Sequence, residues 1–289
     1  MKTKLVYVLV SNDNDYYYEM VVMSLYSFRL YHPFSKVEIA MDRDTYQRLK
    51  EKPVSILGDV TPVVVDIPSE YNVVQRSRYL KTNLRQFIEG DFLFIDCDTL
   101  ICGSLEKIDN VLADIGMVSD LNRAFPLLDS RVVALNQQAG FSPTSDEPYY
   151  NGGVAYVKDT PVAHHFFYTW FHNWQLSVEK GVSKDQPSLC ESNKDLGFPI
   201  QELSACWNCQ MGGKNTRYIY KAKILHYFNI MEYGKVKKKV LERIKETGRP
   251  DALISVILHF PRLMFYMIYL KHYVRDSYYR IRDFYYWHR

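Results

Sequence analysis

Short apolar runs alternate with helix-like segments along the first hundred residues, and this alternation constrains the fold more than any other feature. The apolar runs have the length of strands buried on both faces and fall at residues 4–10, 36–41, 61–67 and 92–95. The segments between them have apolar side chains at helical spacing and fall at residues 17–31, 45–52 and 79–89. Strands that alternate with helices favour an α/β domain with a mainly parallel central sheet. Ligands of such sheets bind beyond the carboxyl ends of the strands.

The second half of the chain continues this pattern less regularly. Residues 115–119 and 153–157 are expected to form strands, and residues 160–179 an aromatic helix. Residues 120–150 are loop-rich and are expected to form a lid or a wall of the acceptor side. We therefore expect one α/β domain at residues 1–234 and a helical extension at residues 235–289.

The C-terminal extension differs from the rest of the chain in charge. Residues 235–289 contain 13 Lys and Arg against 5 Asp and Glu, a net charge of +8, whereas the other residues contain 23 against 28, a net charge of −5. Aromatic and basic residues alternate there, and this composition favours attachment to an anionic membrane surface. The alternative is a helix that packs on the domain or on a second subunit of a homo-oligomer. Nothing in the extension resembles a base-reading module, so we do not expect nucleic acid as a partner.

The cysteine content and the apolar runs point to the cytoplasm. The five cysteines form no regular framework and indicate reduced thiols. Cys206 and Cys209 form a lone CxxC pair, which fits ordinary buried thiols or a redox or metal site. No apolar stretch reaches the roughly 20 residues of a membrane-spanning helix. We expect a cytoplasmic protein that is peripheral on the inner membrane face.

Two aspartates directly follow the apolar run FLFI at residues 92–95. Side chains on a strand alternate between its faces, so Asp96 and Asp98 should point the same way and Cys97 the opposite way. Two neighbouring carboxylates repel each other unless a cation lies between them, and oxygen ligands suit Mg²⁺ or Mn²⁺. Such an ion keeps open positions that a diphosphate can fill. The alternative is a pair of solvated turn acids.

Three other groups are candidates for a site, and each has a purely structural alternative. Asn151 precedes two glycines that would let a ligand approach the backbone, although a plain turn would have the same residues. Asp185 and Gln186 precede a predicted helix and would also serve as a helix cap with a polar neighbour. His226 ends the apolar run KILHYF and would also fit a buried strand histidine.

Taken in order, these pieces resemble the family 8 glycosyltransferases, the group of glycogenin and the lipopolysaccharide galactosyltransferases. The resemblance runs from the first strand to about His226. The matching pieces are LVSND (9–13), SLYSFRLYHP (24–33), YLKTNL (79–84), FLFIDCDTLICGSL (92–105), YNGGVAYV (150–157), KDQPSL (184–189) and KILHY (223–227). No piece is specific by itself, and the resemblance depends on their order and spacing.

The resemblance implies a Rossmann-like GT-A fold and a retaining transferase that moves a hexose from a UDP-sugar to a glycan or lipid-linked acceptor, as in lipopolysaccharide synthesis. Asp96, Asp98 and His226 would hold Mn²⁺ or Mg²⁺, which would neutralise the departing diphosphate. The implied donor-binding residues are Leu9, Ser11, Asn12, Tyr16, Tyr17, Lys81, Asp96, Cys97, Asn151, Gly152, Asp185 and Gln186.

The implied catalytic residues are Asp185 and Gln186. Asp185 and Asn151 would hydrogen-bond the donor sugar, and Gln186 would lie near the anomeric carbon on the face opposite the leaving group. An amide is a poor nucleophile, so a front-side attack through an oxocarbenium-like state is favoured over a covalent intermediate.

The sequence departs from the family pattern after His226. Family members usually continue with a glycine and a Lys-Pro-Trp that contacts the phosphates, whereas this chain continues Tyr-Phe-Asn-Ile-Met-Glu-Tyr-Gly. Either Lys221 or Lys235 substitutes for this lysine, or phosphate binding is weakened, or the protein is a degenerate relative. Two alternatives to an active transferase stay open: a membrane-associated scaffold that has lost turnover, and a nucleotidyltransferase that makes nucleotide sugars. The latter would need a Gly-rich phosphate loop after the first strand, and SNDND has no glycine.

Overall fold

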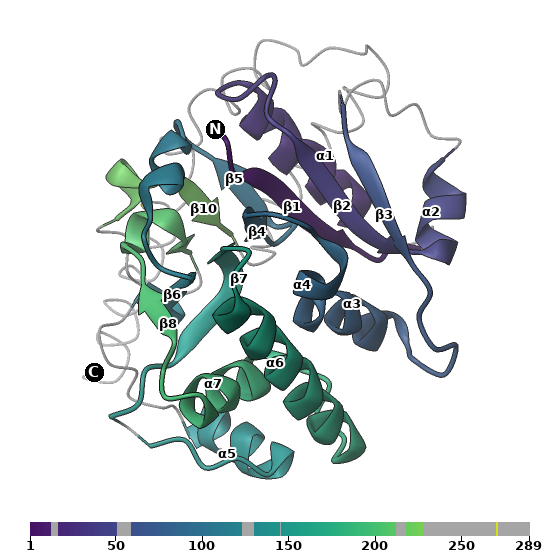
Figure 1. Cartoon of the computed structure of the whole chain (residues 1–289), viewed down its shortest axis with the longest axis vertical. Helices are drawn as coiled ribbons and strands as arrows, with labels where there is room; N and C mark the ends of the chain where they lie inside the picture. Colours follow the sequence, from purple (N-terminus) through teal and green to yellow (C-terminus); the bar gives the residue numbers. More distant parts are fainter. Residues whose placement is uncertain are drawn as a thin grey trace, which may run out of the picture.

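The computed structural model describes residues 1–12, 17–50, 59–122, 130–144, 146–211 and 218–227, together with Leu270. The strands are β1 Lys4–Leu9, β2 Val37–Asp42, β3 Thr61–Val65, β4 Phe92–Ile95, β5 Thr99–Ile101, β6 Ile115–Ser119, β7 Tyr150–Val157, β8 Ile200–Glu202, β9 Cys209–Gln210 and β10 Ile224–His226. The α-helices are α1 Tyr17–Arg29, α2 Arg43–Leu49, α3 Val73–Thr82, α4 Leu84–Phe87, α5 Ser130–Ala139, α6 Pro161–Glu179 and α7 Gln186–Asp195. Figure 1 shows their arrangement.

The described residues form one large sheet and one small sheet. The large sheet has seven strands in the order β3-β2-β1-β4-β7-β6-β8, and all neighbours are parallel except the two pairs that contain β7. The small sheet has the order β5-β10-β9. The expected α/β domain with a mainly parallel central sheet is therefore confirmed.

The central strands are buried on both faces, and successive side chains enter two different cores. In β1, Leu5 and Tyr7 belong to the core that includes α1, whereas Val6 and Val8 belong to the core under α3 and α6. Figure 1 shows α1 on one side of the sheet and α3, α4 and α6 on the other. Burial of both faces explains why these strands read as continuous apolar runs rather than as alternating ones. Each fully buried aliphatic or aromatic side chain contributes about 1.5–3 kcal/mol to stability.

Most expected elements are present, with two differences. The helix expected at 79–89 begins at Val73, where Asn72 and Gln75 form a reciprocal capping box, and a short second helix, α4, follows it after Asn83. The stretch 120–150, expected to consist of loops, contains α5. Leu270 apart, the C-terminal extension lies outside the described residues, and with it the expected boundary at residue 234.

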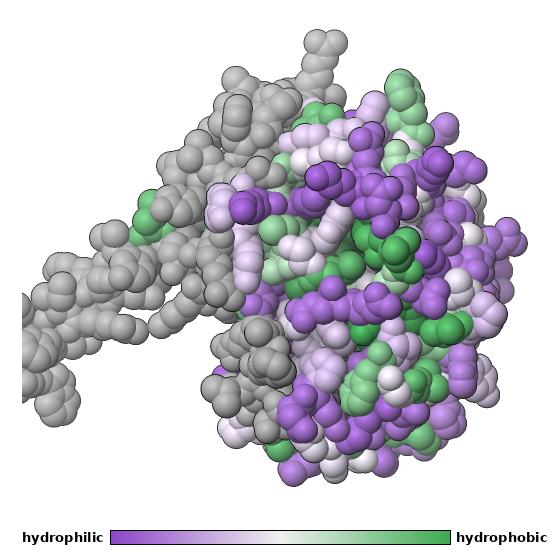
Figure 2. All heavy atoms as spheres, turned by 60° about the vertical axis from the view of Figure 1, so that its left-hand side comes forward, coloured by the Kyte–Doolittle hydropathy of each residue, from purple (hydrophilic) through white to green (hydrophobic). Residues whose placement is uncertain are grey.

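The surface of the described part is mixed in polarity. On the face in Figure 2, hydrophilic residues predominate and hydrophobic residues form small groups between them. Among the described helices, none has the length and apolar character needed to cross a bilayer. All five cysteines are free thiols.

Candidate active site

Polar residues gather at one edge of the large sheet because of the strand directions. β1, β4 and β6 run the same way, so their carboxyl ends lie at one edge. β7 runs in the opposite direction, so its first residues lie at that same edge. Asp96 after β4, Asp120 after β6 and Asn151 at the start of β7 are thereby brought together. This is the edge at which parallel sheets bind ligands.

Asp96, Asp98 and His226 come together beside this edge. Each offers one ligand atom, and these atoms lie within 4.8 Å of one another. His226 reaches this place because β10 pairs with β5, which puts His226 opposite Thr99, and because the Tyr227 N–H donates to Asp98 O at 3.0 Å. A stretch that follows Asp98 by more than a hundred residues thus completes the cluster.

The donor set of this cluster fits a divalent cation such as Mn²⁺. Nε2 of His226 lies 3.2 Å from Oδ1 of Asp98, and Nδ1 of the same ring contacts Oδ1 of Asn208 at 3.1 Å. Burial acts to raise the pKa of Asp98, but His226, a backbone hydrogen bond and Lys81 together outweigh burial, so this pKa is lowered and the carboxylate stays ionised. Carboxylate oxygens with one imidazole nitrogen suit Mn²⁺.

Gly153 leaves room for the His226 ring. A methyl group on Gly153 would overlap Cε1 of His226 and would lie 2.8 Å from its Nδ1. The carbonyl of Gly153 also accepts a hydrogen bond of 2.8 Å from the Asp96 N–H, which continues the β4–β7 pairing. Gly153 therefore lies against two members of the cluster, the His226 ring and the backbone of Asp96.

Two buried or partly buried cations lie next to the cluster and share one carboxylate. Nζ of Lys81 lies 3.1 Å from Oδ1 of Asp96 and 3.1 Å from Oδ2 of Asp185, while Nε of Arg78 lies 3.0 Å from Oδ1 of Asp185. Burial acts to lower the pKa of Lys81, but Asp185 and Asp96 outweigh it and the pKa is raised. Burial acts to raise the pKa of Asp185, but Arg78 and Lys81 lower it to about 2. Arg78, Lys81 and Asp185 are therefore charged at neutral pH.

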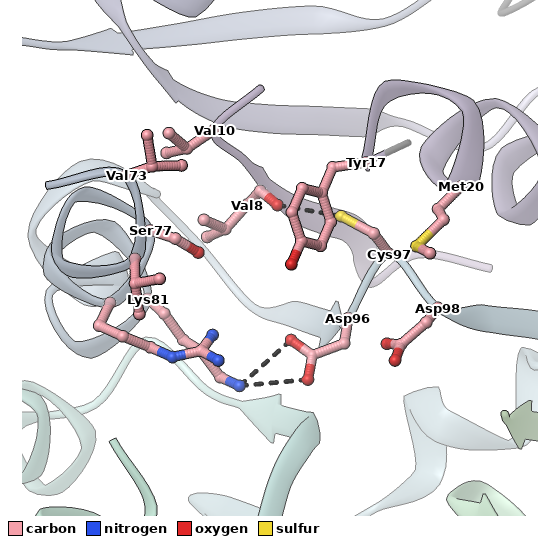
Figure 3. A pocket seen from close by; sticks show the side chains of 12 residues that line it. Val8, Val10, Tyr17, Met20, Val73, Ser77, Lys81, Asp96, Cys97 and Asp98 are labelled. Atoms are coloured by element: carbon pink, nitrogen blue, oxygen red, sulfur yellow. Dashed lines mark hydrogen bonds and ion pairs between the residues drawn. The ribbon is translucent and has the colours of Figure 1, made fainter. Parts of the chain in front are cut away.

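A pocket of about 220 Å³ opens beside these charges. Its walls come from β1, α1, α3 and the segment after β4, and Figure 3 shows Lys81 directed at Asp96 on one side and the Tyr17 ring on the other. The lining residues are Val8, Val10, Tyr17, Met20, Val73, Val74, Ser77, Arg78, Lys81, Asp96, Cys97 and Asp98. The pocket thus has an apolar end, formed by valines and an aromatic ring, and a charged end. Such a division suits a ligand with a flat ring and an anionic group.

Only some of the expected donor-binding residues line the pocket. Tyr17, Lys81, Asp96 and Cys97 line the pocket. Gly152 lies nearby, since a methyl group there would be 3.6 Å from Cε of Lys81 and 3.7 Å from Oδ2 of Asp185.

Leu9 does not fit its expected place. Its side chain lies on the opposite face of β1, in the core with α1 and α2, while its neighbours Val8 and Val10 line the pocket. The alternation of side chains along a strand separates them. Ser11 and Asn12 follow β1 but are not among the lining residues, and the Ser11 N–H donates to Oγ1 of Thr45. Tyr16 lies outside the described residues.

Asp185 and Gln186 begin α7. Asp185 is buried against Arg78 and Lys81 instead of capping the helix with its side chain. Gln186 is partly exposed at the first helical position, and no hydrogen bond or ion pair joins its side chain to another described residue.

Cys97 donates a hydrogen bond from Sγ to the carbonyl of Val8 at 3.2 Å, and burial raises the pKa of its thiol well above the usual range. Its thiol therefore points toward β1, away from the two aspartates on either side.

Sequence reasoning missed three polar residues of this region: Arg78, Asp120 and Asn208. Arg78 lies one helical turn before Lys81 in QRSRYLK, so the helical spacing would have put both cations on one face. Asp120 directly follows a predicted strand, as Asp96 does, so its position in the sequence could have indicated a site residue in the same way. Asn208 has no local signal, because only the fold brings it to His226.

The comparisons with known proteins show the fold. No protein-family model matches the chain, and no curated protein matches it. Solved structures do match. Mouse xyloside xylosyltransferase 1, in its apo form, is similar with a TM-score of 0.54 and 14% identity over 79% of this chain and 98% of that one.

Two further solved structures agree with this likeness. The bifunctional glycosyltransferase WbbM, also apo, has a TM-score of 0.53 and 17% identity over 79% of this chain and 46% of its own. The glycosyltransferase GlyE of Streptococcus pneumoniae TIGR4 has a TM-score of 0.54 and 14% identity over 86% of this chain and 64% of its own. At these identities the likeness concerns the fold alone. The chain has the α/β GT-A fold of glycosyltransferases, with a mainly parallel central sheet.

Proposed function

We propose that this protein is a metal-dependent glycosyltransferase that uses a nucleotide-sugar donor. The observation that carries the proposal is the position of the Asp96, Asp98 and His226 cluster at the charged end of a pocket, at the ligand-binding edge of a glycosyltransferase fold. The apolar end of the pocket, with Tyr17, suits the base of a nucleotide. Asp96, Asp98 and His226 would hold Mn²⁺ or Mg²⁺. When bound, the ion would neutralise the negative charge that grows on the leaving diphosphate.

The cations beside the cluster would contribute to the same task. Lys81 and Arg78 lie at the charged end of the pocket and are held there by Asp185. We propose that they orient the diphosphate or the sugar of the donor, in place of the Lys-Pro-Trp lysine that the sequence lacks after His226. This assignment favours an active transferase over a relative without turnover, and the missing Gly-rich loop disfavours a nucleotidyltransferase.

We propose a retaining hexosyltransferase of family 8 that uses UDP-sugar, with Asp185, Gln186 and Asn151 facing the sugar. Oδ1 of Asn151 accepts two hydrogen bonds within the protein, and one N–H of its Nδ2 is taken by Asp120. Asn151 would therefore act toward the sugar as a donor with its second N–H. Gln186 would stabilise the positive charge on the sugar ring through its carbonyl oxygen.

Our proposals for the acceptor and for the cellular location depend on the C-terminal extension, residues 235–289. We propose a glycan or lipid-linked acceptor in surface polysaccharide or lipopolysaccharide synthesis, reached from the cytoplasmic face of a membrane. The net charge of +8 in residues 235–289 and their aromatic content support attachment to anionic lipid.

Calorimetric titration with UDP, in the presence and absence of Mn²⁺, tests the proposed function. We expect measurable UDP binding with Mn²⁺ and at least a tenfold loss when Mn²⁺ is omitted or when Asp98 is replaced in Asp98→Ala, equivalent to about 1.4 kcal/mol. Glu179→Ala, at an exposed position at the end of α6, is the matched control and should bind as the wild type does. A screen of hydrolysis of UDP-glucose, UDP-galactose and their N-acetyl forms then identifies the sugar. A UDP affinity that changes neither on omission of Mn²⁺ nor in Asp98→Ala would contradict the proposal.

A further inference from the structure

A chain of buried amides lies behind the His226 ring. Asn208 is fully buried between the 3₁₀ helix Ala205–Trp207 and β9, and its backbone is fixed on both sides. Its N–H donates to the carbonyl of Ala205, and its carbonyl accepts a hydrogen bond of 2.7 Å from Nδ2 of Asn122. The backbone of Asn208 is therefore held in place, and within the described part of the chain its side-chain amide hydrogen-bonds to His226 and Asn151.

The orientation of these amides follows from one backbone N–H. The Gly153 N–H can only donate, and it points at Oδ1 of Asn151 at 3.0 Å, so this atom of Asn151 is the carbonyl oxygen. The Asn208 atom that lies 3.0 Å from the same oxygen must then be its NH₂ group. Consequently, the carbonyl oxygen of Asn208 is the atom that faces Nδ1 of His226 at 3.1 Å, and Nδ1 must carry the proton of that hydrogen bond.

This orientation decides which ring nitrogen of His226 can act as a ligand. A neutral imidazole with its proton on Nδ1 has its lone pair on Nε2. Nε2 is the atom that faces the carboxylate of Asp98 in the cluster. Without the Asn208 carbonyl, the proton of the neutral ring would be free to sit on Nε2 and hydrogen-bond to Asp98, which would remove the ligand atom from the cluster.

We propose that Asn208 is a positioning residue, which holds His226 in the tautomer and orientation that present Nε2 to a divalent cation. Asn151 and Gly153 act behind it, since Asn151 fixes the amide of Asn208 and Gly153 leaves room for the ring. The proposal rests on the proposed function, because it assigns the residues behind the same metal centre. Such partners of a metal-bound histidine typically contribute 10- to 100-fold to metal affinity, on the order of 1.4–2.7 kcal/mol.

Titration of Mn²⁺ alone into the full-length protein, with free Mn²⁺ followed by electron paramagnetic resonance, tests this role. We expect Asn208→Leu, which keeps the approximate volume but has no acceptor, to bind Mn²⁺ about 10- to 100-fold more weakly than the wild type. Asn208→Asp keeps an acceptor for Nδ1 and should bind within about threefold of the wild type, or more tightly, although it loses the contact with Asn151. A purely structural role of Asn208 would make both variants bind equally weakly.

Asn193→Ala is the matched control. Asn193 is also fully buried, and its Oδ1 accepts a hydrogen bond of 3.0 Å from the Ile200 N–H, outside the cluster of Asp96, Asp98 and His226. We expect this variant to lower the melting temperature and to leave the Mn²⁺ affinity unchanged. If Asn208→Leu does not fold, Asn208→Asp alone decides: retained affinity supports the proposal, and a loss of tenfold or more in the folded variant overturns it.

The outcomes separate this inference from the proposed function. A wild-type protein that does not bind Mn²⁺ would overturn the metal centre and with it the proposed function. A wild-type protein that binds Mn²⁺, together with an Asn208→Leu variant that binds it equally well, would overturn the role of Asn208 alone. A complementary measurement is the ¹⁵N spectrum of His226 in the protein loaded with diamagnetic Zn²⁺. The proposal expects the proton on Nδ1, and a proton on Nε2 would contradict it.

Discussion

At the scale of single residues, Asp185 balances the charges beside the pocket. It accepts contacts from both Arg78 and Lys81, and these two cations outweigh the effect of its burial. Its carboxylate is the partner that allows two positive charges to remain next to each other in a largely buried place. Removal of this one charge would leave Arg78 and Lys81 to repel each other.

The lowered pKa of Asp185 makes stability depend on pH. The pKa is about 2 in the folded chain and about 4 in an unfolded one, so the folded state binds the proton less readily. The carboxylate therefore stabilises the fold fully above about pH 4, and this contribution is lost as the pH falls toward 2. We expect the metal-free wild type to lose about 2 kcal/mol more unfolding free energy over this interval than Asp185→Asn. Urea unfolding at several pH values measures the difference, and parallel curves for the two proteins would contradict the assignment.

Residue-level prediction from sequence was best where the signal was local. The two aspartates after a buried strand could be predicted as a pair. His226 was added to them by the family resemblance, which depends on the order of the motifs, and the structure brings the three side chains together. The side on which Leu9 lies could have been read from strand alternation, because Val8 and Val10 take the other face. The contact of Asn208 with His226 could not be predicted from the sequence, since it depends on the pairing of β9 with β10.

At the scale of elements, β4 is the strand that supports the cluster. Phe94 is 2% exposed, packs in the core under α3 and α6, and lies with its ring 5.2 Å from Nζ of Lys81. Two residues further on, the chain reaches Asp96. Packing of the Phe94 ring therefore fixes both the strand and the cation that faces its end.

Truncation of this ring should be costly. We expect Phe94→Ala to lower the free energy of unfolding by about 3–5 kcal/mol, because it leaves a cavity in a core that cannot collapse around it. Tyr168→Ala, at a position of α6 that is 66% exposed, should change it by less than about 0.5 kcal/mol. Chemical denaturation of both variants measures this contrast. A loss below about 1 kcal/mol for Phe94→Ala would show that β4 is not held as the packing implies.

The alternation of elements was predictable, and its exceptions have physical reasons. The apolar runs identified most strands because both faces are buried. The reversed direction of β7 was not predictable, because strand direction is set by pairing with β4 and β6 and not by local sequence. The start of α3 could have been found from the capping box at Asn72 and Gln75, which lies before the first apolar residue of the predicted helix.

At the scale of the whole molecule, the chain divides into a slightly acidic body and a basic, aromatic extension. Residues 235–289 carry a net charge of +8, and the remainder carries −5. A charge of this size on a short segment attracts anionic surfaces over about one Debye length, roughly 8 Å at physiological salt. The proposed active centre and the proposed attachment segment thus lie in different parts of the chain.

Vesicle flotation tests this attachment. We expect the full-length protein to float with vesicles that contain phosphatidylglycerol, to float less with neutral phosphatidylcholine vesicles, and to be released in about 1 M salt, where the Debye length falls to about 3 Å. A chain that ends at Tyr233 should remain in solution with both vesicles. Equal flotation of the two chains would contradict a role of residues 235–289 in membrane binding.

We propose that Asp96, Asp98 and His226 bind one divalent cation that carries a nucleotide diphosphate. Anomalous diffraction at the manganese edge, from crystals soaked in Mn²⁺ and UDP, would locate such an ion. We expect one strong anomalous peak among the three side chains, with Nε2 of His226 facing it and the diphosphate of UDP on its open side. A map with UDP in the pocket and no peak at this position, or with His226 turned away from the peak, would contradict it.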